Sequence, residues 1–380
     1  MAMLVTDNEA FAGFLEELGA ADAYALDAEF HGETSYYPRL AVLQLAVPGR
    51  VAVVDATMVD IRPLGAVLEG DGLLVAHAGE QDLGVLYRAT GTLPARMFDT
   101  QIAAGFLGFG SPGLASLVRE LLGVHMEKGS QMSDWFKRPL TAEQVSYAAA
   151  DVAHLVELRS VIEQRLVAAG RVDWAYEEFE RHRRVREPDA TAAWWRLKGF
   201  RQLRGRSRGV AQEVAAWRER TAMATDKPAR RVLADEVVML LAERPPSSVR
   251  EMPTSRLFDV RRLSSQTVDE LLTAVARGRD LAAGGLRLPP VDDLPGHLQP
   301  LATLLTAWVA EQSRALSISA ALIATRKDIE AFLRRVPDNR LEQGWRAELV
   351  GTTMGRIVAG KAALAYDGGH GLVVVDGPRT

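Results

Sequence analysis

The sequence contains no cysteine among its 380 residues, which excludes disulfide bonds and thiolate metal sites. A metal ion would have to be held by oxygen or imidazole ligands, and carboxylate oxygens are typical ligands of magnesium and manganese. The sequence also has no run of about 18 consecutive apolar residues, and no basic segment followed by an apolar core at its N-terminus. We therefore expect a cytoplasmic protein without membrane spans, and its length predicts two or three domains.

The two halves of the chain carry opposite net charges. Residues 1–180 contain 12 Lys and Arg against 26 Asp and Glu, whereas residues 181–380 contain 33 against 23. The densest basic segment is residues 181–209, with 10 basic and 2 acidic side chains. Such a cluster of arginine is either a solvated linker or a surface that attracts a polyanion such as a nucleic acid.

The acidic half has the pattern of a mixed α/β sheet covered by helices. Residues 24–32, 40–47 and 50–56 predict three consecutive antiparallel strands, with Pro48 and Gly49 as a hairpin turn. Strand and helix then alternate. Further strands are predicted at 73–78 and 96–100, and helices at 79–91, 113–123 and 141–170, the last opened by a capping box of Thr141 and Gln144. From about residue 195 the periodicity is helical.

Two carboxylates lie within the first of these strands, in YALDAEFHG. Because side chains alternate between the faces of a strand, Asp27 and Glu29 project from the same side, and apolar residues point to the other. Two carboxylates about 7 Å apart on one face repel each other unless a proton, an arginine or a metal ion lies between them. The pattern fits either a solvated strand face or half of a cation site.

Other acids of this half could complete such a site. Asp82 falls in the first turn of the helix that follows His77, where an acid is also favoured by the helix dipole alone. Tyr147 and Asp151 are four residues apart in an alanine-rich helix and therefore share one face. We expect this polar pair to face inward.

These motifs carry a family resemblance. In their order and separation, LDAEF, HAGEQD and YAAAD resemble the three exonuclease motifs of the DEDD superfamily, and the tyrosine is typical of its DEDDy branch. The wider segments resemble bacterial ribonuclease D over nearly the whole chain, namely YYPRLAVLQLA (36–46), FDTQIAA (98–104), SDWFKRPLT (133–141) and ATRKDIEAFLRR with GWRAELVG near the C-terminus.

The resemblance implies a fold and a set of domains. We expect an α/β ribonuclease H-like exonuclease domain, with a mixed sheet whose first three strands are antiparallel, followed by two all-α helical bundles of the helicase-and-RNase-D C-terminal (HRDC) type. The expected boundaries are an exonuclease domain at 1–180, a basic connector at 181–200, an HRDC domain at 201–282, a linker at 283–296 and a second HRDC-like domain at 297–375.

The resemblance also implies a metal-dependent 3′-to-5′ exoribonuclease that trims structured RNA precursors, tRNA above all, and releases nucleoside 5′-monophosphates. Asp27, Glu29, Asp82 and Asp151 would hold two divalent ions, Mg²⁺ or Mn²⁺, with Asp27 bridging them. Tyr147 would orient the attacking water. No obligate protein partner is evident in the sequence, and we expect a monomer.

Substrate contacts are predicted from basic and aromatic residues. His77 in the second motif, and Lys128, Trp135 and Arg138 before the last catalytic helix, are candidates to border the entrance for RNA, although Trp135 could equally be a packing anchor. In the basic connector, Trp194 and Trp195 could stack on bases or pack between helices.

Two other functions fit the same residues. A DNA exonuclease would use the same catalytic set. In addition, no residue of the sequence identifies a reader of the RNA 2′-hydroxyl, so the sequence does not separate RNA from DNA. An inactive adaptor that only binds nucleic acid would also keep the fold, although none of the four acids is missing.

Overall fold

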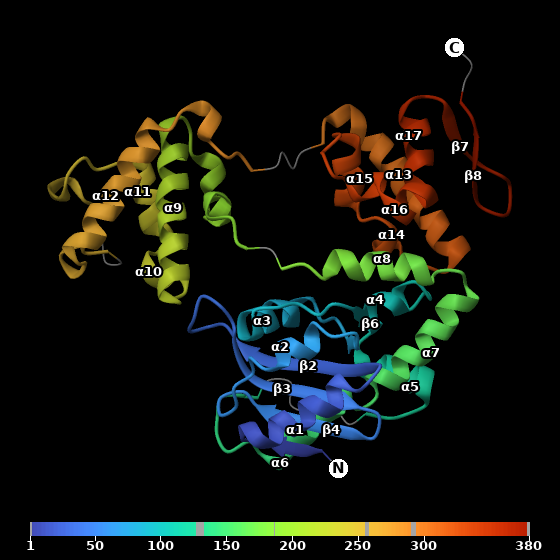
Figure 1. Ribbon diagram of the computed structural model, residues 1–380. Helices are drawn as coiled ribbons and strands as arrows, with labels where there is room; N and C mark the ends of the chain where they lie inside the picture. The colour runs from blue at the N-terminus through green and yellow to red at the C-terminus, as the bar shows by residue number, and fades with distance from the viewer. Residues whose placement is uncertain (1, 127–132, 186, 255–257, 290–293, 378–380) are drawn as a thin grey trace. The chain divides into compact units, whose positions relative to one another are not determined.

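The computed structural model describes residues 2–126, 133–185, 187–254, 258–289 and 294–377 (Figure 1). The chain forms two compact units. The first contains Met1–Phe30, Leu40–Val185 and Asp292–Thr380, and the second contains His31–Arg39 and Arg186–Val291.

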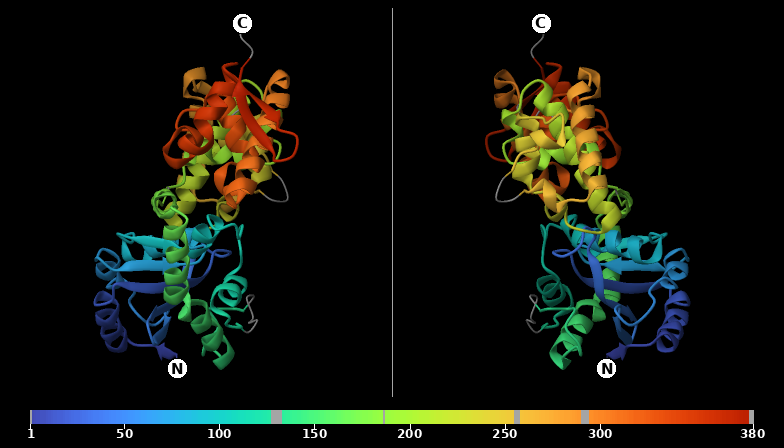
Figure 2. Two further views of the ribbon diagram at one scale, coloured as in Figure 1. Left: turned by 90° about the vertical axis from the view of Figure 1, so that its right-hand side faces the viewer. Right: turned by 90° about the vertical axis from the view of Figure 1, so that its left-hand side faces the viewer.

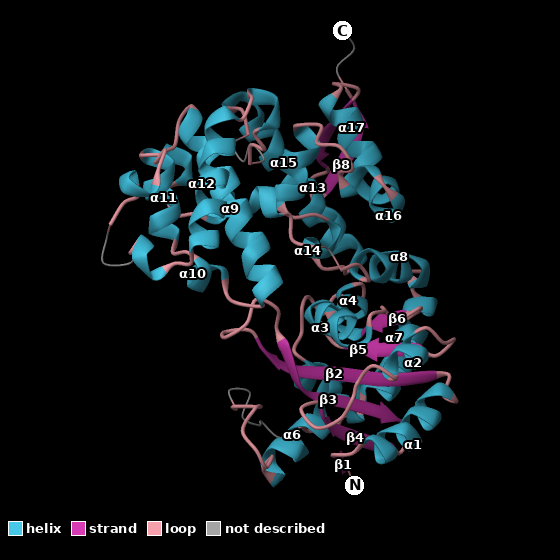
Figure 3. Ribbon diagram, turned by 60° about the vertical axis from the view of Figure 1, so that its left-hand side comes forward, coloured by secondary structure: helices cyan, strands magenta, loops and turns pink. Residues whose placement is uncertain are grey.

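The first unit is built on a six-stranded mixed sheet with the strand order β1-β4-β3-β2-β5-β6 (magenta in Figure 3). β3 and β4 are antiparallel, whereas β1 is parallel to β4, and β5 is parallel to both β2 and β6. The strands are β1 (Met3–Val5), β2 (Ala23–His31), β3 (Arg39–Val47), β4 (Arg50–Asp55), β5 (Leu73–Ala76) and β6 (Met97–Asp99).

The hairpin between β3 and β4 forms where the sequence predicts it. Val47 pairs with Arg50 across a two-residue turn of Pro48 and Gly49, and Gly49 has a φ of 81°, which glycine adopts without strain. The predicted order of strands is wrong in one respect, because β1 precedes them and pairs in parallel with β4 at the sheet edge. Its three residues are too few to show an alternating pattern, and its partner lies some fifty residues away.

Helices cover both faces of this sheet. Phe11, Phe14 and Leu18 of α1 pack with α2 and α3 on the face that carries Tyr24 and Leu26 of β2. The other face is covered by α4, α5, α7 and α8. Their bounds are α1 (Asn8–Gly19), α2 (Leu64–Leu68), α3 (Glu80–Thr90), α4 (Thr100–Gly105), α5 (Leu114–Leu122), α7 (Leu155–Ala168) and α8 (Val172–His182).

The single helix predicted over residues 141–170 is in fact two. α6 (Ala142–Ala153) ends at His154, whose backbone (φ −112°, ψ 0°) is not helical, and α7 begins at the next residue. Ala148 and Ala149 of α6 pack against β3 and β4, whereas the buried side chains of α7 join the core beside α4 and α5. The break lets the two halves pack on different parts of the sheet, and no glycine or proline marks it in the sequence.

The C-terminal helices belong to the first unit and share its core. Trp345 stacks on Trp174 of α8 at 5.4 Å between ring centroids and meets Phe106 edge-on at 5.1 Å. Beneath them, Arg346 donates a 2.5 Å hydrogen bond to Glu178, and both side chains are buried. The helices are α13 (Gln299–Leu316), α14 (Ala320–Ile323), α15 (Arg326–Leu333), α16 (Gly344–Arg346) and α17 (Thr352–Val358), with a π-helical turn at Ala347–Gly351.

The sequence predicted that this region is all-α, and that prediction is wrong. β7 (Ala362–Tyr366) and β8 (Leu372–Asp376) form a two-stranded antiparallel sheet after the last helix (Figure 2). Pairing of Ala362 with Asp376 and of Tyr366 with Leu372 closes a hairpin over a glycine-rich loop. The prediction failed because β7 follows the helical pattern directly and is only five residues long.

The second unit is a helical bundle around α9. Its core contains Trp194, which is 1% exposed, and residues of α9, α11 and α12. α9 and α12 approach closely at Gly278, where a Cβ would lie 2.4 Å from Cα of Val210, so a larger residue does not fit there. The elements are a 3₁₀ helix at Ala190–Arg196, α9 (Arg206–Thr225), α10 (Ala229–Val232), α11 (Asp235–Glu243) and α12 (Ser265–Asp280).

The loop between β2 and β3 is part of this second unit. The hydroxyl of Tyr36 donates a 2.5 Å hydrogen bond to buried Glu219 on α9, and Arg196 donates to the same carboxylate at 2.6 Å. The backbone N–H groups of Tyr36 and Tyr37 both donate to Asp226 at 3.1 Å. The helical bundle therefore fixes a loop that begins directly after the strand carrying Asp27 and Glu29.

Candidate active site

The acidic strand lies at the carboxyl end of a parallel neighbour. In β2, Tyr24, Leu26 and Ala28 join the core on one face, so Asp27 and Glu29 project from the other, as the alternation predicts. Ala25 of β2 pairs with Val75 of β5. Continuing this register places Asp27 beyond the last residue of β5, level with the loop that leads into α3.

Asp82 enters from the first turn of α3 and is 8% exposed. The loop before α3 makes a sharp turn, because Ala78 has a positive φ of 58° and a Cβ on Gly79 would lie 2.8 Å from Cβ of Ala76. This turn is held by the buried carboxylate of Asp99, which accepts hydrogen bonds from the N–H groups of Ala78 (3.2 Å) and Gly79 (3.0 Å).

Asp99 is a residue that the sequence did not single out. Its carboxylate also caps α4, accepting from the N–H groups of Gln101 (2.8 Å) and Ile102 (3.1 Å). One side chain thus ties the end of β6 and the start of α4 to the loop before Asp82. The signals in the sequence are the segment FDTQIAA (98–104), which is part of the family resemblance, and an aspartate directly before a helix, which is typical of any N-cap.

Tyr147 and Asp151 lie on α6, which begins with the predicted capping box. Gln144 N–H donates to the Thr141 hydroxyl at 3.2 Å, and Thr141 N–H donates to Gln144 Oε1 at 3.0 Å. One turn apart on this helix, the Tyr147 hydroxyl donates a hydrogen bond to the Asp151 carboxylate.

The four acids lie close enough for their charges to affect one another, and together they are called the acidic cluster. Burial and the charges of Asp27, Asp151 and Asp82 raise the pKa of Glu29 to about 8. Burial and the charge of Asp27 raise the pKa of Asp151 to about 7, and the same two causes raise that of Asp82. Burial also raises the pKa of Asp27. Carboxyl groups that raise one another's pKa in this way favour a positive charge between them.

The donor set suits hard divalent cations, since it consists of carboxylate oxygens. Among the residues that the structure describes, no group of three or more His, Asp or Glu side chains is placed so that it could hold a metal ion. The case for a cation therefore rests on the mutual pKa effects and on the identity of the donors.

Of the four predicted substrate contacts, two make contacts with the protein interior and one lies outside the described residues. Trp135 is 6% exposed and packs between the sheet and α6. The Arg138 guanidinium forms a salt bridge with Asp55, which is 2% exposed. Lys128 lies outside the described residues.

His77, the fourth predicted contact, has both ring nitrogens engaged. Nδ1 lies 2.9 Å from the Thr100 hydroxyl, and Nε2 lies 3.1 Å from the carbonyl oxygen of Pro112. Burial holds its pKa below the ordinary value. These contacts favour a structural role for the ring.

In the second unit, the tryptophans of the basic connector pack rather than stand free. The indole N–H groups of Trp194 and Trp195 both donate to the carbonyl oxygen of Arg287, at 3.2 Å and 3.0 Å. The Arg287 guanidinium lies over the Trp195 ring at 5.7 Å from its centroid. The alternative in which Trp194 packs between helices is the one that the structure supports.

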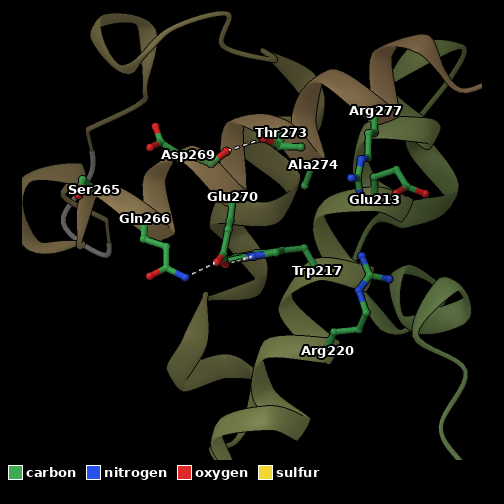
Figure 4. A pocket seen from close by; sticks show the side chains of 10 residues that line it. All are labelled: Glu213, Trp217, Arg220, Ser265, Gln266, Asp269, Glu270, Thr273, Ala274 and Arg277. Atoms are coloured by element: carbon green, nitrogen blue, oxygen red, sulfur yellow. Dashed lines mark hydrogen bonds between the residues drawn. The ribbon is translucent and has the colours of Figure 1, made fainter.

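A hollow of about 550 Å³ lies between α9 and α12 of this unit (Figure 4). Trp217 donates its indole N–H to Glu270 at 3.1 Å, and Gln266 donates to the same carboxylate at 3.0 Å. Arg220 and Arg277 also line the hollow. Three carboxylates, those of Glu213, Asp269 and Glu270, line the hollow together with these two guanidinium groups, so it has no positive excess to attract a phosphate chain.

Comparison with known proteins agrees with this architecture. Residues 3–167 match the 3′–5′ exonuclease family model, and residues 207–275 match the HRDC domain model. The latter match covers one HRDC domain, and the predicted count of two is not supported. Within the described residues, no helix is long and apolar enough to cross a membrane.

Full-length relatives show the same similarity. The chain is 34% identical to a ribonuclease D of Gluconacetobacter diazotrophicus, covering 99% of this chain and 95% of the relative. It is 35% identical to a ribonuclease D of Acidiphilium cryptum, covering 99% and 97%. Among solved structures, the crystal structure of Escherichia coli RNase D matches with a TM-score of 0.80 and 30% identity, over 94% of this chain and 99% of that one.

Proposed function

The chain belongs to the ribonuclease D family of 3′–5′ exoribonucleases, and we propose that its substrates are structured RNA precursors, tRNA precursors above all, from which it releases nucleoside 5′-monophosphates. The E. coli member is described as an exoribonuclease involved in structured RNA processing. Family membership favours an exoribonuclease over the DNA exonuclease and the inactive adaptor that the sequence left open. The observation that carries the proposal is the cluster of Asp27, Glu29, Asp82 and Asp151 beside Tyr147.

Exonuclease domains of this family use divalent metal ions. In this chain Asp27, Glu29, Asp82 and Asp151 would hold two of them, Mg²⁺ or Mn²⁺. The residues fit such ions because all their donors are carboxylate oxygens and each pKa is raised in the cluster, so that nearby positive charge stabilises the ionised forms. Bound divalent ions supply activation of water and stabilisation of charge on the transferring phosphoryl group.

The protein groups have separate tasks in the proposed reaction. Tyr147 donates a hydrogen bond to Asp151, which fixes the phenol at the edge of the cluster, where it orients the attacking water. Asp99 holds the turn before α3 so that Asp82 faces the same space. The sheet and the two helices α3 and α6 therefore carry all the groups of the proposed site.

RNA binding is assigned mainly to the regions outside the exonuclease domain. In this proposal residues 1–180 carry catalysis, the basic connector at 181–200 and the HRDC domain at 201–282 contact phosphates, and residues 297–375 support the exonuclease domain after a linker at 283–296. Phosphate contacts give affinity without sequence preference. The cluster of four acids lies in one chain, so the protein is proposed to act as a monomer without an obligate partner, in the cytoplasm.

The test is Asp151→Asn on an RNA with a single-stranded 3′ extension, in magnesium or manganese. We expect hydrolysis to be lost and RNA binding to be retained, because the substitution removes one carboxylate of the cluster and leaves the fold intact. Asp71→Asn, which removes the same charge from an exposed loop, is the matched control and should remain fully active.

Two outcomes would contradict the proposal. Unaltered activity of Asp151→Asn would mean that the site is elsewhere. A clear preference of the wild-type protein for DNA over an RNA of the same sequence would mean that RNA precursors are not its substrates.

A further inference from the structure

The segment before α6 is fastened to the sheet by a buried ion pair. Asp55, the last residue of β4, accepts hydrogen bonds from Nε and Nη2 of Arg138, the latter at 2.6 Å. Asp55 also accepts from the N–H and hydroxyl of Thr57, at 3.0 Å and 2.6 Å. Burial alone would raise the pKa of Asp55, but the bonds from Arg138 and Thr57 outweigh it and hold the pKa below its usual value, so the pair is charged.

The remaining guanidinium donors of Arg138 hold backbone rather than point to solvent. Nη2 donates to the carbonyl oxygen of Ala41 on β3 at 3.1 Å, and Nη1 donates to the carbonyl oxygens of Trp135 at 2.5 Å and Lys137 at 3.0 Å. Arg138 therefore connects two strands to the chain at Trp135. An arginine with these contacts has no donors left over for a phosphate chain.

Trp135 transmits this constraint to the catalytic helix. Its ring lies 6.1 Å from that of Tyr147, tilted by 35°, and it packs with Ala41 of β3 and Ala148 of α6. Gln144 reinforces the same contact, since its side-chain amide donates to the carbonyl oxygen of Asp134 at 3.4 Å. The Tyr147 ring is thus bounded on one side by an indole whose backbone is clamped by Arg138.

We infer that Asp55 and Arg138, through Trp135, are positioning residues that fix the Tyr147 ring for its hydrogen bond to Asp151. This inference rests on the role proposed above for Tyr147. It replaces the prediction that Trp135 and Arg138 border the RNA entrance, because a residue that holds Tyr147 changes the rate of the chemical step, whereas an entrance residue changes RNA binding.

The experiment compares steady-state kinetics of Arg138→Lys and wild type on a short single-stranded RNA. Lysine keeps the positive charge but lacks the planar fork that reaches both Asp55 and the backbone carbonyl groups. We expect kcat to fall about tenfold or more and KM to change less than about twofold, since small misplacement of a catalytic group costs up to about a hundredfold in rate. Trp135→Phe, which keeps an aromatic ring without the full indole contact, should give the same split even if Arg138→Lys is unstable.

The matched control is Arg62→Lys. Arg62 and Asp60 form a similar two-bond pair after β4, but Arg62 is exposed and both residues belong to one surface turn. This substitution should leave kcat and KM at their wild-type values.

A double-mutant cycle separates positioning from mere stability. In a Tyr147→Phe background, Arg138→Lys should cause no further loss of kcat, because the hydroxyl that Arg138 helps to place is already gone. Three results would each overturn the inference. The first is a loss of kcat in the Tyr147→Phe/Arg138→Lys double variant that equals the product of the two single losses. The second is a wild-type kcat for both Arg138→Lys and Trp135→Phe, and the third is a raised KM with an unchanged kcat. A fully active Tyr147→Phe would remove the role of Tyr147 and the inference with it, while the exonuclease site itself is judged separately by Asp151→Asn.

Discussion

Replacing Asp151 by asparagine should stabilise the protein in the absence of divalent metal ions while it abolishes hydrolysis. The pKa of Asp151 rises from 3.8 to about 7 on folding, because burial and the charge of Asp27 both disfavour its ionised form. At about 1.4 kcal/mol per pH unit, ionising Asp151 in the folded protein costs about 4 kcal/mol above pH 7. Asp151 is only partly buried, so solvent screening reduces this to about 2 kcal/mol.

The sign of the pH dependence follows from the raised pKa. The folded protein binds this proton more tightly than the unfolded chain, so stability is complete below the unfolded pKa near 4 and is lost as the pH rises through the folded pKa near 7. Asparagine carries no proton to lose. Without metal, the melting temperatures of wild type and Asp151→Asn should converge near pH 4 and diverge toward pH 8.

Thermal unfolding in excess EDTA, followed between pH 5 and pH 8, measures this difference. A gain of about 2 kcal/mol corresponds to about 4–8 °C for a domain of this size. Magnesium should raise the melting temperature of wild type more than that of the variant, because binding to the folded state adds stability. An Asp151→Asn protein that is no more stable than wild type at pH 8 without metal, or that shows the same pH dependence, would refute the reasoning.

Two further predictions concern the rest of the chain. Arg346→Met should lower the free energy of unfolding by about 3–5 kcal/mol, because it leaves the buried Glu178 carboxylate without its guanidinium partner. Denaturant unfolding of this variant and of the Glu178→Met/Arg346→Met double variant checks this prediction. The double variant should recover much of the lost stability. RNA affinity of the Asp151→Asn protein should fall at least about tenfold between about 50 and 200 mM salt, if the basic cluster at 181–209 neutralises phosphates as proposed. An affinity independent of salt in a filter-binding titration would exclude that role.

Local signals in the sequence predicted local structure well. Alternation placed Asp27 and Glu29 on one face of β2, and the capping box opened α6 at Thr141. Gly91 was expected to end the third helix, and it does so with a φ of 82°. Each of these features depends on residues within about four positions of one another, so the physics that fixes them is legible in a short window.

Features that depend on distant partners could not be predicted in this way. The strand β1 is defined by its pairing with β4, and the break at His154 by the different surfaces under α6 and α7. The C-terminal helices were expected to form a separate bundle. Instead Trp345 contacts both Phe106 and Trp174, and each contact joins residues more than 150 positions apart in the sequence.

Arg138 shows why only part of the site could be predicted from the sequence. In the sequence it is one of several cations in a loop before a catalytic helix, which is the pattern of a substrate-binding residue. Its partner Asp55 lies 83 residues earlier, at the end of β4, and nothing in the sequence around Asp55 indicates that this carboxylate is buried. Since a buried carboxylate without a partner is costly, the burial of Asp55 decides where the guanidinium goes. The family motifs predict the four acids, whereas the pairing of Arg138 with Asp55 became identifiable only once the fold had brought the two side chains together.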